Sequence, residues 1–184
     1  MAATRQNITQ QDITQQNNTQ QDIKAVEGIW QILQSVPDPE IPVLNVLDLG
    51  IVRTVAVDQR HVRVSITPTY SGCPATDTIA QDIRKTLVEA GYQDPEIEVV
   101  LSPAWTTDWI SKEGREKLLA YGIVPPIESS ADSSALFSRP VEIPCPRCKS
   151  VDTILVSQFG STPCKALYKC AACLEPFDYF KCLK

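Results

Sequence analysis

Cysteine placement constrains this chain more than any other feature of its sequence. Six of its seven cysteines lie in the last 40 residues, and four of these form two Cys-x-x-Cys pairs, Cys145/Cys148 and Cys170/Cys173, separated by 21 residues. Two residues between thiolates allow one tight turn to direct both sulfurs at one ion, and two such turns close the tetrahedral four-cysteine site that zinc favours. Residues 141–184 bury too little apolar surface to fold on a core alone. We therefore predict a small β-rich zinc ribbon over this segment, held by structural Zn²⁺ at the four paired cysteines.

The cysteine pattern leaves some alternatives open. Four thiolates also suit an iron–sulfur cluster. Cys164 and Cys182 either replace a member of a Cys-x-x-Cys pair, pair with each other under oxidation, or serve as small apolar residues of the ribbon. The aromatic residues Phe177, Tyr179 and Phe180 are expected to form the ribbon's core and a docking face rather than a ligand site.

Charge and hydropathy exclude several classes of function. The 184 residues carry a net charge of −5, and 43% of them are hydrophobic, so a packed core is expected and general binding to nucleic acid is not. The N-terminus lacks a signal pattern and no apolar run approaches membrane-spanning length, so we predict a soluble, cytoplasmic protein that binds neither membranes nor nucleic acid. Thiols stay reduced in that compartment, so the cysteines are expected to be metal ligands or reactive groups rather than disulfides.

The order of apolar and turn-forming residues predicts two domains after a polar tail. Residues 1–23 are rich in Gln, Asn and Thr and are expected to be disordered. Folding is expected to start at Lys24, where apolar residues begin to recur at helical spacing. A Ser-rich linker, residues 127–140, is expected before the ribbon. Between them we expect two paired strands, a helix, a strand and a helix, over Gly50–Val57, His61–Thr67, Pro74–Ala90, Glu96–Leu101 and Asp108–Tyr121.

This order, α-β-β-α-β-α, predicts an α+β domain over residues 24–126. We expect a small three-stranded sheet with helices on one side, because Ile79, Ile83 and Leu87 form one apolar face of the second helix.

The seventh cysteine, Cys73, stands apart in the sequence Tyr-Ser-Gly-Cys-Pro at residues 70–74. Pro74 suits the first turn of a helix, so Cys73 is expected at or beside the N-cap. The positive end of the helix dipole favours a thiolate there, as a metal ligand or a nucleophile. The alternative is a small buried residue that only fills a gap. The single histidine, His61, is expected at the surface rather than as a base for Cys73, so we do not expect an enzyme that acts alone.

Three segments resemble the iron–sulfur cluster assembly family that includes the SufT-type proteins: DPEIPVLNVLDLGIV at residues 38–52, SGCP at residues 71–74 and LSPAWTTDWISKEGREKL at residues 101–118. With the cysteine-rich tail, residues 25–184 resemble the PaaD family, the accessory proteins of phenylacetyl-CoA epoxidase (ring 1,2-oxygenase) systems. The Gln-rich first 22 residues lie outside the resemblance.

The resemblance implies a non-catalytic accessory subunit in aerobic phenylacetate degradation. Such a subunit would help to assemble iron–sulfur or iron centres of the oxygenase and reductase components, which are the expected partners. Cys73 matches the family's reactive cysteine and is expected to hold iron or an iron–sulfur cluster transiently. Asp38 matches the acidic residue of the DPE motif. Residues 103–106 match a family loop that we expect near Cys73, and a homodimer would bring two Cys73 thiolates to a two-fold axis.

The residues also allow a different hypothesis. Asp38 and Glu40 are simply explained as part of a polar loop that ends the first helix. The chain would then be a structural or regulatory subunit that docks on the oxygenase through its zinc ribbon, with Cys73 as a packing residue.

Overall fold

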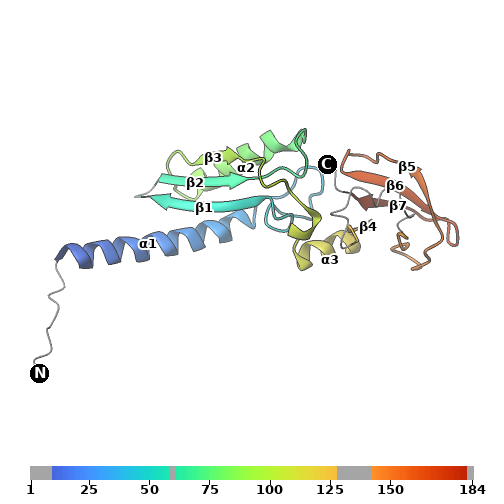
Figure 1. Cartoon of the computed structure of the whole chain (residues 1–184), viewed down its shortest axis with the longest axis horizontal. Helices are drawn as coiled ribbons and strands as arrows, with labels where there is room; N and C mark the ends of the chain where they lie inside the picture. The colour runs from blue at the N-terminus through green and yellow to red at the C-terminus, as the bar shows by residue number, and fades with distance from the viewer. Residues whose placement is uncertain (1–9, 59–60, 128–141, 182–184) are drawn as a thin grey trace, which may run out of the picture.

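The computed structural model describes residues 10–58, 61–127 and 142–181, with side chains from Asp22 onward. The predicted linker and Cys182 lie outside these ranges, apart from residue 127. Two sheets lie next to each other along the long axis of the molecule, and helix α1 extends away from the first sheet (Figure 1). Within the described ranges, no helix has the length and apolar character needed to cross a bilayer.

The first sheet contains a hairpin and one parallel strand. Its strands are β1 (Val52–Asp58), β2 (His61–Ile66) and β3 (Glu96–Val99), in the order β1-β2-β3. Strands β1 and β2 are antiparallel, whereas β3 is parallel to β2. Parallel neighbours need a crossover connection, which helix α2 (Ala75–Glu89) supplies. The predicted α+β class and the order of these elements are confirmed.

Helices α1 (Gln10–Leu33) and α2 pack on the sheet through one shared core. The predicted apolar face of α2 is buried, because its three residues are at most 4% exposed. The core residues from α1, α2 and β2 are Ile29, Leu33, Ile79, Ile83, Leu87, Val62, Val64 and Ile66.

Helix α1 begins earlier than the sequence predicted. Residues 10–23, which composition predicted to be disordered, are helical, and residues 1–9 lie outside the described part of the chain. The helical tract contains neither Pro nor Gly, and Gln is a good helix former. A helix already anchored by Ile29 and Leu33 therefore extends at little cost, since only its nucleation is expensive.

The third predicted helix, over residues 108–121, is divided in two. A 3₁₀ turn, η1 (Thr107–Trp109), precedes helix α3 (Lys112–Ala120), and the two residues between them are extended. Ser111 acts as N-cap of α3, because its Oγ accepts a hydrogen bond from the Gly114 N–H at 2.8 Å.

The second sheet joins both parts of the chain. Its strands are β4 (Ile123–Val124), β5 (Thr153–Ser157), β6 (Lys165–Cys170) and β7 (Pro176–Phe180), in the order β4-β7-β6-β5. Strands β5, β6 and β7 form an antiparallel ribbon, as predicted for the cysteine-rich tail. Strand β4, which follows α3 in the first domain, pairs parallel with β7 and so adds an edge strand to the ribbon.

The ribbon packs directly on the first domain. Phe180 at the end of β7 is 2% exposed and belongs to the first domain's core, where its ring meets Trp105 edge-on at 6.2 Å between centroids. The Trp105 Nε1–H donates to the Leu49 carbonyl at 2.8 Å. Cys164 is buried in the same core. The interface therefore contains aromatic and thiol groups removed from water.

Candidate functional site

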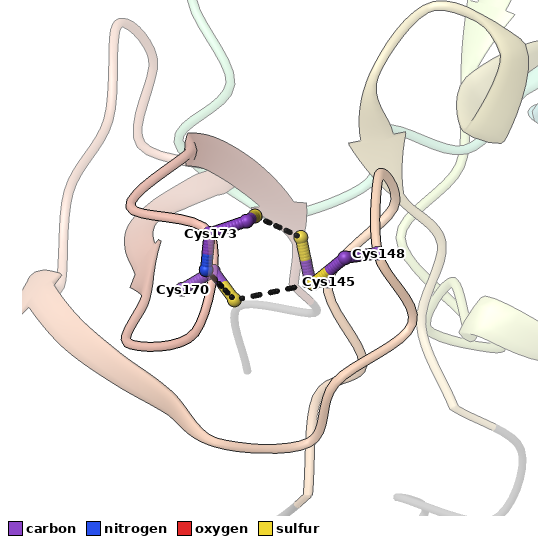
Figure 2. Close-up of side chains that lie close together, drawn as sticks. All are labelled: Cys145, Cys148, Cys170 and Cys173. Atoms are coloured by element: carbon purple, nitrogen blue, oxygen red, sulfur yellow. Dashed lines mark hydrogen bonds between the residues drawn. The ribbon is translucent and has the colours of Figure 1, made fainter.

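Four thiols of the ribbon converge on one point (Figure 2). Their sulfurs lie within 4.8 Å of one another, with Sγ–Sγ distances of 3.6 Å for Cys145–Cys173 and 3.5 Å for Cys148–Cys170. Four sulfurs bound to one zinc at about 2.3 Å stand about 3.8 Å apart in a tetrahedron. The structure thus brings together the four cysteines that spacing selected, and this donor set fits Zn²⁺.

The two Cys-x-x-Cys turns share one backbone geometry. In the first, the Lys149 N–H donates to the Cys145 carbonyl at 3.0 Å, and Lys149 has φ of 63°. In the second, the Leu174 N–H donates to the Cys170 carbonyl at 3.0 Å, and Leu174 has φ of 64°. Two copies of one tight turn therefore present four sulfurs to a common centre, which is the arrangement that a closed structural site needs.

The second turn also favours ionisation of one thiol. The Cys173 N–H donates to the Cys170 sulfur at 3.5 Å. This hydrogen bond is the largest of several that together lower the pKa of Cys170 to about 7, against the opposing effect of burial. The thiolate is the form that binds metal, so Cys170 gives up its proton readily when a cation arrives.

Cys73 lies directly before α2, where the sequence placed it. Pro74 occupies the N-cap position, and the Cys73 carbonyl accepts hydrogen bonds from the Thr76 N–H at 3.2 Å and its Oγ1 at 2.9 Å. The residue is half-buried and packs against the first domain's core. Its thiol is thus held at the edge of the core, partly open to solvent.

A small cavity of about 20 Å³ lies beside Cys73. Asp38, Thr67 and Thr76 line it together with Cys73 and apolar residues. Thr67 is 2% exposed, yet its hydroxyl has no hydrogen-bond partner among the described residues. A cavity of this size accommodates roughly one water-sized species. An unpaired buried hydroxyl costs about 1–3 kcal/mol, so the cavity suits a small polar ligand that would pair with Thr67.

Asp38 organises the loop next to this cavity. Its Oδ1 accepts hydrogen bonds from the Glu40 N–H at 2.8 Å and the Ile41 N–H at 2.7 Å. Burial raises the pKa of the Asp38 carboxyl, while the two N–H groups and the nearby Lys165 oppose that rise. One carboxylate oxygen is therefore used within the DPE loop, which favours a positioning role for Asp38.

Sequence reasoning missed the place of Cys164. This residue precedes β6, is 4% exposed, and lies in the first domain's core rather than in the ribbon's. Its Sγ lies 3.0 Å from the Thr162 Oγ1 and donates to the Glu40 Oε2 at 3.6 Å. Burial raises the pKa of Cys164 to about 11. The only sequence signal for such a role was negative, since Cys164 stands outside both Cys-x-x-Cys pairs.

Tyr70 lies within electrostatic range of both isolated cysteines, Cys73 and Cys164. Burial raises the pKa of its hydroxyl to about 12, and Cys73, Glu40 and Cys164 add to this rise because each places negative charge nearby when ionised. The hydroxyl oxygen is buried, and no group in the described part of the chain meets hydrogen-bond geometry with it, although the nearby Cys73 side chain contributes to its raised pKa.

The sequence predicts His61 at the surface and residues 103–106 near Cys73. His61 is exposed and contacts Glu96 on β3 at 3.4 Å, which confirms the first of these predictions. The loop over residues 103–106 does not line the cavity beside Cys73, although Trp105 contacts the backbone of Leu49, which does.

Comparison with known proteins divides the chain as the fold does. A family model described as an iron–sulfur cluster assembly protein matches residues 27–99, and one described as the PaaD zinc beta ribbon domain matches residues 129–181. A protein of Escherichia coli (strain K12), named as a putative subunit of 1,2-phenylacetyl-CoA epoxidase, is 50% identical over 158 residues, which are 86% of this chain and 93% of that protein. The chain belongs to the PaaD family. The resemblance carried by the DPE, SGCP and paired-cysteine motifs is thereby confirmed.

The first domain of this PaaD family member is also similar to separate small proteins. An "Fe-S protein maturation auxiliary factor" of Porphyromonas gingivalis is 37% identical over 98 residues, or 52% of this chain and 92% of that protein. The crystal structure of a DUF59 domain from Bacillus anthracis has a TM-score of 0.52 and 25% identity, and the match covers 54% of this chain and 96% of that one. The chain thus combines an iron–sulfur assembly-type domain with a zinc ribbon.

Proposed function

We propose that this chain is a cytoplasmic accessory factor, without catalytic turnover of its own, that helps to assemble iron–sulfur or iron centres of a phenylacetyl-CoA epoxidase. Cys73 is the proposed transient ligand of the iron or cluster, and the ribbon cysteines are the proposed ligands of a permanent zinc. The observation that carries the proposal is the half-buried Cys73 thiol beside a small cavity with an unpaired hydroxyl. The names of the relatives supply the epoxidase and the maturation role.

The two thiol sites suit different lifetimes of metal binding. Four thiolates that surround an ion leave no open position, so they retain it and stabilise the fold. A site that is partly open to solvent and has fewer thiolates binds iron more weakly and exchanges it with other ligands. Such exchange is what delivery to the oxygenase or reductase component requires.

Replacement of Cys73 by Ser tests this function, because Ser keeps the size but is a poor ligand for iron. We expect Cys73→Ser to keep about one zinc per chain, in line with one four-cysteine site. Oxygenase and reductase components produced together with it should show the low iron content, sulfide content and epoxidation rate found without this protein. The exposed neighbour Ser71 provides the control, and Ser71→Ala should support wild-type levels. Full maturation by Cys73→Ser would contradict the proposal.

Metal content of the protein purified without oxygen gives an independent test. We expect about one zinc per chain, from the ribbon site, together with substoichiometric iron that is lost in air. Zinc without any iron, even after attempted loading with iron and sulfide, would argue against a ligand role for Cys73.

A second candidate function is supported by the outer strand of the ribbon. Strand β5 lies at the edge of its sheet, and its residues Ile154, Leu155 and Val156 are all exposed. An apolar edge strand is a typical docking surface for another protein. The chain would then be a structural or regulatory subunit that binds the oxygenase through β5.

Copurification with the oxygenase distinguishes this second function. Val156→Lys should abolish a stoichiometric complex, whereas Val88→Lys, at an exposed apolar position on α2, should not. A complex that supports full activity with Cys73→Ser favours docking over maturation. The predicted homodimer remains a prediction, and light scattering on the purified protein tests it.

A further inference from the structure

Strand β5 closes the ribbon sheet on the side opposite the first domain (Figure 1). In the order β4-β7-β6-β5, β4 is the strand that follows α3 in the first domain, so β5 is the edge furthest from it. Among the described residues β5 pairs with β6 alone, which leaves its outer row of backbone N–H and C=O groups unpaired. Proteins commonly protect such an edge with charged side chains or proline. The five residues of β5, Thr153–Ser157, contain neither, so the strand is open to pairing with another strand.

The side chains around β5 follow a pattern that reads the same in both directions. Residues 151–159 are Val-Asp-Thr-Ile-Leu-Val-Ser-Gln-Phe, with apolar residues at the first, fourth, fifth, sixth and ninth positions. This arrangement is symmetric about Leu155. The apolar side chains are all 44–59% exposed, and a cluster of exposed apolar side chains marks an interaction surface. They are Val151, Ile154, Leu155, Val156 and Phe159.

A strand with a symmetric pattern is complementary to a second copy of itself. When two β5 strands pair antiparallel about Leu155, each apolar residue faces an apolar one and each polar residue faces a polar one. A register shifted by one residue would instead set Ile154 opposite Ser157, so the pattern selects a single register. The facing pairs are Thr153–Ser157, Ile154–Val156, Leu155–Leu155 and, just beyond the strand, Val151–Phe159.

The charges beside β5 are complementary in the same register. Asp152 is the only charged residue among residues 151–159, and it would stand opposite Gln158 of the second copy. The Lys181 ammonium donates to the Gln158 carbonyl and lies 4.2 Å from the centre of the Phe159 ring. Pairing therefore brings an acidic group of each copy towards a basic group of the other, and it sets no like charges opposite each other along the strand.

We propose that two copies of this chain pair antiparallel through β5 and join their ribbons in one continuous sheet. The contact is two-fold symmetric and uses the β5 edge of both copies, so it closes as a dimer. The opposite edge offers no route to further growth. Strand β4 there has two residues, Ile123 and Val124, and each is 4% exposed.

The size of the contact predicts a weak dimer. Five side chains of this exposure bury on the order of 1,000 Å² in total over the two copies, which is near the lower limit for specific interfaces. A β-bulge between Leu155 and Ser157 adds local twist and confines the regular ladder to a few residues. Cys73 belongs to the first domain, so this dimer differs from one that joins two Cys73 thiolates. It does not depend on the proposed function.

Light scattering on the zinc-loaded full chain tests the dimer. We expect the mass to rise from one chain to two over a concentration range of about 1–200 µM, as a contact of this size allows. Ile154→Lys and Val156→Glu each place a charge among apolar side chains of the contact, and each should weaken dimerisation by about tenfold or more. Val88→Lys, at a 51% exposed position on α2, is the control and should dimerise as the wild type does. Zinc content and circular dichroism show that each variant keeps its fold.

Mixing the two variants tests the register, because Ile154 and Val156 face each other only in this antiparallel pair. In a mixed dimer, the introduced lysine of one copy faces the introduced glutamate of the other, while the second such position keeps its apolar pair. The equimolar mixture should therefore dimerise about tenfold more tightly than either variant alone. Native mass spectrometry identifies the mixed dimer by its mass.

The possible results separate the second copy from other occupants of β5. A wild-type chain that stays monomeric at about 200 µM overturns the inference, because a specific contact of this size would be populated there. A dimer that Ile154→Lys leaves intact also overturns it, since another surface then holds the copies together. A mixture that stays monomeric shows that the register is wrong. If the wild type is monomeric and Ile154→Lys removes a complex with the oxygenase, β5 binds that protein instead. Cys73→Ser should dimerise normally, so loss of the maturation role would leave this inference standing.

Discussion

At the scale of single residues, Gly50 fixes the backbone beneath the Cys73 cavity. Its φ is 65°, and its neighbours Leu49 and Ile51 both line that cavity. A Cβ at Gly50 would lie 2.2 Å from the Trp109 carbonyl oxygen, which is backbone and has little freedom to move.

We therefore expect Gly50→Ala to lower the free energy of unfolding by about 2–5 kcal/mol, from the strained φ and the steric overlap together. Urea unfolding of the zinc-loaded chain measures this loss. Gly91→Ala is the matched control, because Gly91 also has positive φ, 94°, but no atom within 4 Å of its added Cβ. It should lose only about 1 kcal/mol. Equal losses in the two variants would show that the Trp109 backbone moves away and accommodates the added methyl group at residue 50.

Removal of the Tyr70 hydroxyl should not lower the free energy of unfolding, in contrast to the Gly50 substitution. This buried hydroxyl has no partner among the described residues, so Tyr70→Phe should leave the free energy of unfolding unchanged or raise it by up to about 1 kcal/mol. The comparison variant is Tyr179→Phe, because the Ile127 backbone N–H lowers the pKa of the Tyr179 hydroxyl against the larger rise caused by burial, and loss of that interaction should cost about 1 kcal/mol. Urea unfolding of both variants checks the difference. A marked loss for Tyr70→Phe would mean that the Cys73 sulfur or a bound species already satisfies the hydroxyl.

At the scale of elements, the start of α3 depends on one side chain. The sequence predicted a helix from Asp108, because Gly122 and the two prolines mark only its end. The structure starts α3 after Ser111, where the hydroxyl satisfies an N–H of the first turn. The Ser111 cap is a local feature of the sequence. In contrast, Trp109 and Ile110 lie outside the helix because they pack on the core of the first domain.

Ser111→Ala should lower the free energy of unfolding by about 1 kcal/mol through loss of this cap. Urea unfolding measures the effect, and the exposed Ser71→Ala is its control, with an expected change below about 0.5 kcal/mol. No loss at Ser111 would indicate that water replaces the hydroxyl at the Gly114 N–H.

At the scale of the whole molecule, the ribbon and the first domain depend on each other through Phe180 and Trp105. The small ribbon core contains few buried residues, so the proposed zinc would supply much of its folding free energy. Removal of zinc by a chelator should therefore unfold β5–β7 and withdraw Phe180 from the first core. Tryptophan fluorescence, to which Trp105 contributes together with Trp30 and Trp109, should shift towards longer wavelength, while the helices of the first domain persist. Circular dichroism follows the helices and fluorescence follows the ribbon's docking, and unchanged tryptophan fluorescence would show that docking survives without the metal.

Acid should have the same effect as the chelator. Protons compete with zinc for the four thiolates, so zinc is retained at neutral and higher pH and released as the pH falls. A dye that binds free zinc, read during a pH titration of the full chain, follows this release. Loss of zinc on raising the pH instead would contradict a thiolate site.

The sequence by itself determined the features that depend on local spacing. Two Cys-x-x-Cys turns carry their own geometry, so the grouping of these four cysteines was predictable before any contact was known. Pro74 placed Cys73 at the start of α2 in the same way. Periodic apolar residues likewise predicted the α+β order, because apolar residues recur at different spacings in strands and in helices, and each spacing is visible within a short stretch of sequence.

Only the tertiary structure decided the contacts between the domains. The pairing of β4 with β7, the burial of Phe180 against Trp105 and the contact of Cys164 with Glu40 join residues far apart in the chain. No periodicity or motif specifies such contacts, because they arise from how two folded surfaces fit and from which apolar groups each leaves exposed. The sequence therefore left Cys164 as a spare residue of the ribbon, whereas packing alone placed its thiol in the first domain's core beside Glu40.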